Sequence, residues 1–249
     1  MSLVPCGAEI PKHTVRIADA IGDDAVRGVA LLLAFSGSGK WEIQQTRVTV
    51  DEGLKGLREK RYELVLARVS ELPEKYGAVR EDYAVEGAMI ALHGDNAVND
   101  LSCRELAEIF SGWRKSWRTV NGKEFQIHLM KEPDGAFAVE IFRRKIMGKQ
   151  SFAPAYERQN FMELLELTKI QEHAATLMPR PDIELPDGMR AVAVDHVYPS
   201  LENLRNGRYP LTDRRTALHG KELSPDAGLF LKQLRNAAKI LAQYGLIAL

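Results

Sequence analysis

The stretch VNDLSCRELAEIFSGWRKSW, residues 98–117, carries the clearest local signal in the chain. Ser102 and Glu105 have the spacing of a capping box, in which each side chain accepts a hydrogen bond from the other residue's backbone N–H. The apolar residues that follow recur at helical spacing, and Gly112 is a residue type that commonly ends helices. The sequence therefore predicts a short amphipathic helix between Ser102 and Gly112.

Upstream of this stretch, strand-like and helix-like segments alternate. Residues 45–50, for example, alternate Thr and Val with polar neighbours, which is the period of a half-buried strand. Patterns of these kinds predict strands at residues 14–18, 45–50, 62–69 and 84–93, helices at 25–35 and 51–61, and a flexible Gly/Ser linker at 36–40. Alternating elements of this kind usually form a parallel sheet covered by helices.

Downstream, the alternation continues to the end of the chain. The predicted strands are residues 124–130 and 189–197, and the predicted helices are 136–147, 161–178 at least at its start, 200–207 and 225–244. Ser224 and Pro225 mark the start of the last helix, because Ser is favoured at the cap and Pro in the first turn. The pattern of an α/β protein thus extends over the whole sequence.

The composition is that of a globular protein. The 249 residues are 45% hydrophobic and 27% charged, and no apolar run approaches the roughly 18–20 residues of a membrane span. The 34 Lys and Arg residues balance 34 Asp and Glu residues, so we expect no nucleic-acid partner. Cys6 and Cys103 lack a Cys/His ligand array, and no triad or paired-carboxylate motif is identifiable. We therefore expect no catalytic residue, no metal and no cofactor.

Three stretches support a family resemblance when taken together. They are residues 98–117, quoted above, residues 135–148, and VYPSLENLRNGRYPL at 197–211 with the C-terminal segments SPDAGLFLKQL and YGLIAL. In order and spacing they resemble the phosphate-type substrate-binding proteins of ABC transporters, which have the type 2 periplasmic binding protein fold. The resemblance covers roughly the whole chain.

This resemblance implies an α/β fold of two lobes, with a ligand cleft between the lobes and two hinge crossings. On this sequence it places the crossings near residues 85–92 and 191–197. Lobe 1 would then comprise residues 13–88 and 194–249, and lobe 2 residues 89–193. The resemblance also implies a binding protein that is not an enzyme.

The residues that would hold phosphate are mostly replaced. Helix N-termini, hydroxyl groups and one Arg are good ligands for an oxyanion. Where the related family has a Gly-Ser-Gly-Thr-Arg run, this chain has Gly135, Ala136 and Phe137 followed by Ala and Val. At the first helix start, Asp19, Asp23 and Asp24 stand where hydroxyl residues are expected and would repel a dianion.

The remaining candidates for ligand contacts come from both predicted lobes. They are Asp24, Thr49, Asp51, Arg68, Ser70, Gly135, Ala136 and Phe137. Arg68 is the best candidate for contact with an anion, although an Arg in a loop after a strand is as often a surface residue. Each lost charge-assisted hydrogen bond removes about 1.5–3 kcal/mol, so the sequence predicts weak phosphate binding.

Two functions remain open. The first is a solute receptor for phosphate or another small anion, monomeric and delivering its ligand to an ABC permease or another envelope protein. The second is an interaction or sensory module that keeps the fold without a ligand. The first function implies export to the periplasm or outside the cell, although no basic region followed by an apolar segment, as in a signal peptide, is visible at the N-terminus.

Overall fold

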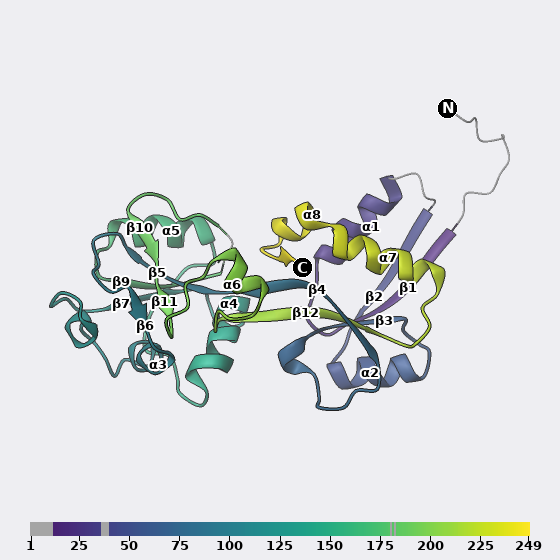
Figure 1. Ribbon diagram of the computed structural model, residues 1–249, viewed down its shortest axis with the longest axis horizontal. Coiled ribbons are helices and arrows are strands. Elements are labelled where there is room, and N and C mark those ends of the chain that lie inside the picture. The colour runs from purple at the N-terminus through teal and green to yellow at the C-terminus, as the bar shows by residue number, and fades with distance from the viewer. Residues whose placement is uncertain (1–11, 36–39, 180, 182) are drawn as a thin grey trace. The chain divides into compact units, whose positions relative to one another are not determined.

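The computed structural model describes residues 12–35, 40–179, 181 and 183–249 (Figure 1). These residues form two compact units. Unit 1 contains the described residues up to Val85 together with Arg214–Leu249, and unit 2 is the continuous segment Glu86–Asp213. The chain therefore passes between the units twice, as a fold with two crossings requires.

Unit 1 is built on a six-stranded sheet. Its strands are β1 (Lys12–Asp19), β2 (Lys40–Arg47), β3 (Leu64–Arg68), β4 (Val79–Gly87), β12 (Thr212–His219) and β13 (Ile247–Ala248). Their order is β13–β4–β12–β3–β1–β2. β1 is parallel to both β2 and β3, which confirms the expected parallel arrangement there, whereas β12 is antiparallel to β3 and β13 to β4.

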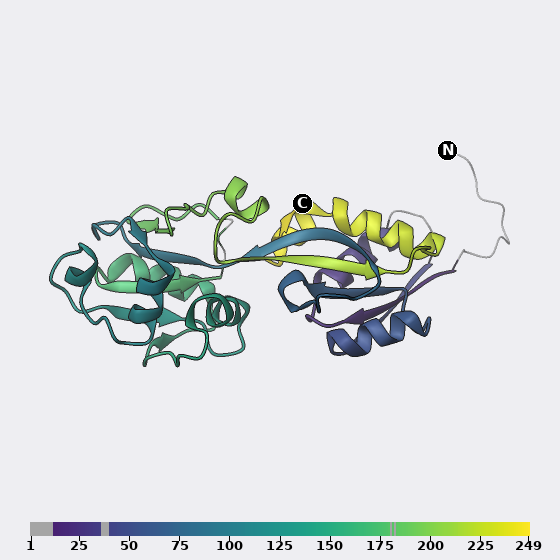
Figure 2. The same cartoon turned by 60° about the horizontal axis from the view of Figure 1, so that its bottom comes forward.

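Helices cover both faces of this sheet (Figures 1 and 2). They are α1 (Ala25–Phe35), α2 (Val50–Arg58), α7 (Pro225–Asn236) and α8 (Ala238–Gln243). Ile17 on β1 packs in the core with α1, α7 and α8, whereas its neighbour Ala18 packs with Leu54 of α2. The two faces follow from the period of the strand, because successive side chains point to opposite sides of the sheet.

Unit 2 is built on a five-stranded sheet. Its strands are β5 (Met89–His93), β7 (His128–Lys131), β8 (Tyr156–Glu157), β9 (Ala174–Met178) and β10 (Met189–Ala191), in the order β10–β5–β9–β7–β8, beside a separate pair β6 (Asp100–Leu101) and β11 (Ala193–Val194). The helices are α3 (Cys103–Phe110), α4 (Phe137–Phe142), α5 (Phe161–Ile170) and α6 (Leu201–Arg205), with the short helical turns η2 (Trp117–Val120) and η3 (Arg143–Met147). Met89, Met178 and Leu164 form the core between the sheet and α5.

The predicted capping box at the start of α3 is confirmed. The Ser102 hydroxyl accepts a hydrogen bond from the Glu105 N–H at 3.1 Å, and the Glu105 carboxylate accepts one from the Ser102 N–H at 2.9 Å. Gly112 follows the helix with φ of 80°, the left-handed conformation that glycine adopts without strain.

Several predicted elements were wrong in extent, and three of them show why. The strand placed at residues 45–50 is β2, which ends at Arg47, because Thr49 caps α2. The strand at 84–93 is two strands, β4 and β5, in two different sheets. The helix at 161–178 begins as predicted at Phe161 but ends at Ile170, and the fully buried β9 follows. A short apolar run such as AATLM fits a helix or a buried strand equally well, so periodicity does not separate the two.

The predicted lobe boundaries also need correction. The structure places the first boundary at 85/86 instead of 88/89, and the second at 213/214 instead of 193/194. Residues 194–213 belong to unit 2 because β11 pairs with β6 and because Tyr209 is fully buried there. The N–H of Ala88 also donates to the Leu211 carbonyl at 2.9 Å, which ties this segment to the start of unit 2.

Candidate functional site

The predicted site residues of unit 1 lie at one edge of its sheet. Asp19 and Arg47, which end β1 and β2, are partners in the parallel register, and Arg68 ends β3. The carboxyl ends of parallel strands meet at the same edge, which is where open α/β sheets bind ligands. The structure thus brings Asp24, Thr49, Asp51, Arg68 and Ser70 to this edge, whereas Gly135, Ala136 and Phe137 belong to unit 2.

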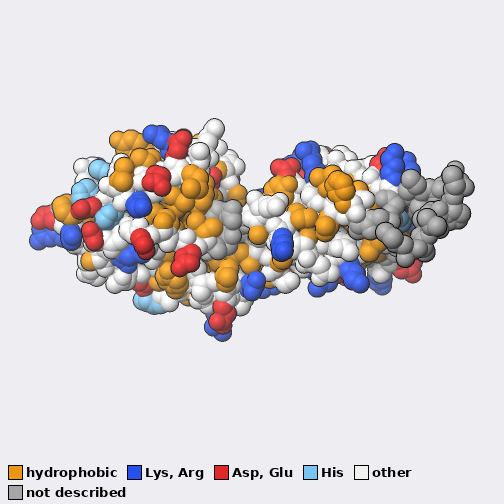
Figure 3. Space-filling view, turned by 90° about the horizontal axis from the view of Figure 1, so that it is seen from above, with side chains coloured by type: hydrophobic (Ala, Val, Ile, Leu, Met, Phe, Trp, Pro, Cys, Tyr) orange, Lys and Arg blue, Asp and Glu red, His pale blue; other side chains and the backbone are white. Residues whose placement is uncertain are grey.

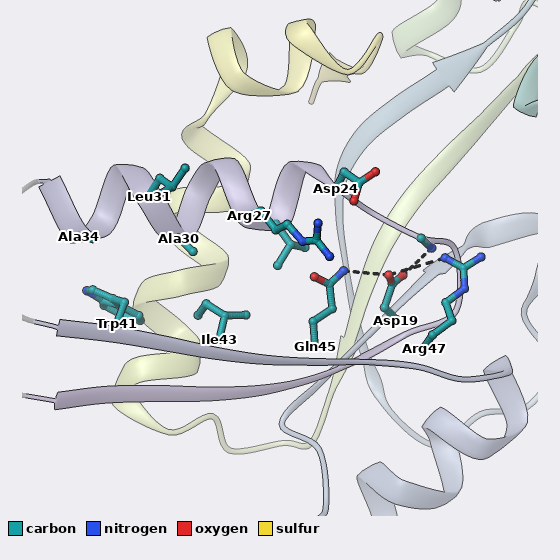
Figure 4. A pocket seen from close by; sticks show the side chains of 12 residues that line it. Asp19, Asp24, Arg27, Ala30, Leu31, Ala34, Trp41, Ile43, Gln45 and Arg47 are labelled. Carbon is teal, nitrogen blue, oxygen red and sulfur yellow. Dashed lines mark hydrogen bonds and ion pairs between the residues drawn. The ribbon is translucent and has the colours of Figure 1, made fainter. Parts of the chain in front are cut away.

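The loop between β1 and α1 already holds an anionic group, the carboxylate of Asp19 (Figure 4). Asp19 is only 3% exposed. Its donors are the backbone N–H groups of Ile21 at 3.0 Å, Gly22 at 2.7 Å and Asp23 at 3.0 Å, and the side-chain amide of Gln45 at 2.8 Å. Arg47 lies 3.7 Å from the same carboxylate. Backbone donors that could receive an oxyanion are therefore occupied by the protein itself.

A second carboxylate, that of Asp23, occupies the start of α1. This fully buried group accepts a hydrogen bond from the N–H of Ala25 at 3.0 Å and forms an ion pair with Arg215 at 3.0 Å. The hydroxyl of Tyr83 donates to its other oxygen. Asp24, the predicted contact in this loop, is instead exposed.

The start of α2 is capped in the same self-contained way. The Thr49 hydroxyl accepts from the Glu52 N–H at 3.3 Å, and the Glu52 carboxylate accepts from the N–H and the hydroxyl of Thr49, each at 2.9 Å. The hydrogen bonds from Thr49 lower the pKa of Glu52. Asp51 is exposed in the first turn and adds a negative charge.

Arg68 is largely buried and has an acidic partner. Its guanidinium lies 3.3 Å from the carboxylate of Glu71, and its backbone is the register partner of Arg215 on β12. Ser70 is exposed in the turn η1 (Val69–Glu71). The two arginines come from adjacent strands, and the charge of each is partly neutralised by a carboxylate of unit 1.

In unit 2, a carboxylate of the protein also contacts the predicted oxyanion position. α4 begins at Phe137 without a side-chain cap, and the N–H of Gly135 donates to the Glu140 carboxylate at 3.3 Å. Nearby, the buried Lys131 forms ion pairs with Asp134 at 3.0 Å and Glu157 at 2.6 Å. No hydroxyl side chain takes part in these contacts.

The sequence predicts Asp19 and Asp23 as repelling charges and does not predict that their carboxylates bind groups of the protein itself. The sequence nevertheless contains a signal for this internal binding. Asp residues on either side of a glycine, between a strand and a helix, favour turns in which the carboxylate accepts backbone N–H groups. Gly22 has φ of 70°, as such a turn requires.

Comparisons with known proteins agree on the fold. No family model matches the chain. PstS from Borrelia burgdorferi superimposes with a TM-score of 0.80 at 14% identity, covering 95% of this chain and 98% of that one. An ABC-type phosphate transport receptor from Vibrio cholerae gives 0.76 at 17% identity, covering 94% and 99%. This chain has the fold of the phosphate-binding receptors.

A sequence relative points in the same direction. The phosphate-binding protein PstS of Bacillus subtilis is 25% identical over 147 residues, which are 59% of this chain and 49% of that protein. The match therefore spans about half the length of this curated relative. The phosphate-receptor fold also occurs elsewhere: the regulatory domain of MetR, a LysR family regulator from N. meningitidis, superimposes with a TM-score of 0.55 at 13% identity over 95% of this chain.

Other kinds of site find no support in the part of the chain that the structure describes. Among those residues, no three His, Cys, Asp or Glu side chains gather where they could hold a metal ion. Nor does any helix of the described ranges have the length and apolar character to cross a membrane. On the face shown in Figure 3, acidic and basic side chains of unit 2 are interspersed.

Proposed function

We propose that this chain is a solute receptor of the ABC-transporter type that binds phosphate weakly or takes another small anion. The phosphate-receptor fold supports the receptor role. The observation that carries weak phosphate binding is the Asp19 carboxylate, which accepts three backbone N–H groups of the loop before α1. A dianion would have to displace this carboxylate and approach the buried Asp23 as well.

Isothermal titration of the wild-type chain with phosphate, sulfate, molybdate and small carboxylates tests the receptor role. We expect phosphate to bind with a Kd of about 1 mM or weaker, which corresponds to about −4 kcal/mol. Micromolar or tighter binding of phosphate would overturn the weak site. Absence of binding across the whole panel would count against the receptor role.

The Asp19→Ala variant tests whether the Asp19 carboxylate causes the weak binding of phosphate. Removing the carboxylate frees three N–H donors and one negative charge, so phosphate affinity should rise about tenfold or more, since one charge-assisted hydrogen bond accounts for at least that factor. Asp24→Asn is the matched control, because it removes another carboxylate from the same loop. Among the described residues, the Asp24 carboxylate accepts no hydrogen bond. Equal phosphate affinity in the two variants would show that charge alone, and not the occupied loop, weakens binding.

The alternative is an interaction or sensory module without a ligand. The self-capped starts of α1 and α2 favour it, because they need no external anion for their stability. If the chain is such a module, no anion changes its melting temperature. If it is a receptor, its ligand raises the melting temperature at saturating concentration. Export and contact with an ABC permease or another envelope protein belong to the first proposal, and co-purification with a permease tests them.

A further inference from the structure

A groove of about 750 Å³ runs along unit 1 between α1 and β2 (Figure 4). β2 is the edge strand of the sheet and pairs only with β1 among the described strands. The volume is within the range of about 300–1,000 Å³ that small-molecule sites occupy. One end of the groove lies beside the Asp19 loop. Its lining therefore changes from apolar to charged along its length.

One end of the groove is apolar. Ala30 and Ala34 are four residues apart on α1 and therefore lie on one side of the helix. Trp41 and Ile43 are two residues apart on β2 and point from the same face of the strand towards that helix (Figure 4). Small residues on the helix and large ones on the strand leave room between them for an apolar group.

The other end is charged and contains both signs. Arg27 of α1 points towards Gln45, and Arg47 of β2 lies beside Asp19 (Figure 4). Asp24 is exposed at the rim. Neither Arg27 nor Asp24 has an ion-pair partner among the described residues, although the two are only three positions apart. The four charged side chains sum to zero, so a simple anion or cation meets attraction and repulsion together.

We infer that this groove binds a zwitterion with an apolar body, such as a short peptide with a large apolar side chain. Its carboxylate would lie at Arg27 and Arg47, and its ammonium group at Asp24. The apolar side chain would lie against Trp41 and Ile43. Arg27 and Ala34 are seven residues apart on the helix, which is about 10 Å at 1.5 Å per residue and matches the length of a dipeptide. This site does not depend on the proposed anion binding.

Titration with leucylphenylalanine, followed by calorimetry and tryptophan fluorescence, tests the inference. Three matched probes each lack one feature: the N-acetyl dipeptide lacks the ammonium, the dipeptide amide lacks the carboxylate, and diglycine lacks the apolar body. We expect each probe to bind at least about tenfold more weakly than the parent dipeptide. Each probe lacks one ion pair or one buried side chain, and the loss of either weakens binding by about this factor. Absence of parent binding, or equal affinity for all four probes, would overturn the site.

Variants locate the binding. Arg27→Gln should weaken the parent dipeptide about tenfold but leave the affinity of the amide unchanged, because the amide has no carboxylate to pair with Arg27. Arg58→Gln, on α2 and outside the groove, is the matched control. If the Arg27 and Arg58 variants bind the parent equally, the zwitterion site is wrong.

A second pair of variants tests the apolar end of the groove. Ala34→Trp should block this end and weaken the binding of the parent dipeptide. Leu32→Trp should not, because Leu32 is exposed on the same helix but does not line the groove.

Discussion

Asp19 accepts hydrogen bonds from three N–H groups of the loop that follows it, and at 3% exposure it is almost fully buried. Asp19→Ala leaves these donors without their acceptor. We therefore expect the free energy of unfolding to fall by about 2–4 kcal/mol. Urea unfolding at pH 7 measures the change, with the exposed Asp24→Ala as control, expected within about 0.5 kcal/mol of wild type. A loss no larger than that of the control would mean that water replaces the carboxylate without cost.

Cys103 is another residue whose chemistry depends on its surroundings. Burial, together with the hydrogen bond to Asp195, raises the pKa of its thiol to about 12. Because the thiolate is the reactive form and a free thiol has a pKa of about 8.5, alkylation at pH 8 should be at least about a hundredfold slower in the folded than in the unfolded chain. Iodoacetamide labelling of a Cys6→Ser background, with and without urea, measures the two rates. Similar rates would contradict the raised pKa.

At the scale of elements, His13 and Asp226 connect β1 to the first turn of α7. The His13 ring lies 2.8 Å from the Asp226 carboxylate, and the N–H of Thr14 donates to the same group at 3.0 Å. The hydrogen bond with His13, followed by that with Thr14, lowers the pKa of Asp226. A lowered folded-state pKa contributes stability above the unfolded value of about 3.9, and this contribution is lost as the pH falls through the folded value.

The Asp226→Asn variant tests this pH dependence. At pH 7 we expect it to reduce the free energy of unfolding by about 0.5–1 kcal/mol, a modest effect because the pair is partly exposed to solvent. The difference from wild type should shrink as the pH falls below about 4. Urea unfolding at pH 7, 5 and 3 measures it. A difference that stays constant over this range would assign the effect to packing and not to the charge.

Elements with strong end signals were predictable, and those without them were not. The capping box of α3 and the Ser-Pro start of α7 fixed these helix starts from local chemistry. β12 has no such signal: its sequence TDRRTALH contains three charged residues and two threonines, yet most of the strand is buried. Thr216 and Asp213 are buried there because neighbouring strands and side chains surround them, which no local pattern encodes.

For the whole molecule, unit 2 is one continuous segment, whereas unit 1 needs the two ends of the chain. The fragment 86–213 contains the complete sheet of β5, β7, β8, β9 and β10 and its own core with α5. We expect this fragment to fold alone with a cooperative urea transition. The fragment 12–85 lacks β12 and α7, so it should remain largely unfolded. Circular dichroism and urea titration of both fragments test this. An unfolded 86–213 fragment would show that unit 2 depends on unit 1.

The sequence by itself determined the α/β alternation, most helix starts and the likeness to phosphate receptors, because these follow from periodicity, capping residues and motif spacing. The resemblance also predicted that hydroxyl residues are missing at the expected oxyanion site. Only the tertiary structure decided that Asp19 and Asp23 fill the loop before α1, and that residues 194–213 belong to unit 2. The reason is physical: the N–H donors come from the loop itself. Distant segments bring the remaining partners, Arg47 to Asp19 and Arg215 to Asp23, and these partners let each carboxylate act as an internal ligand.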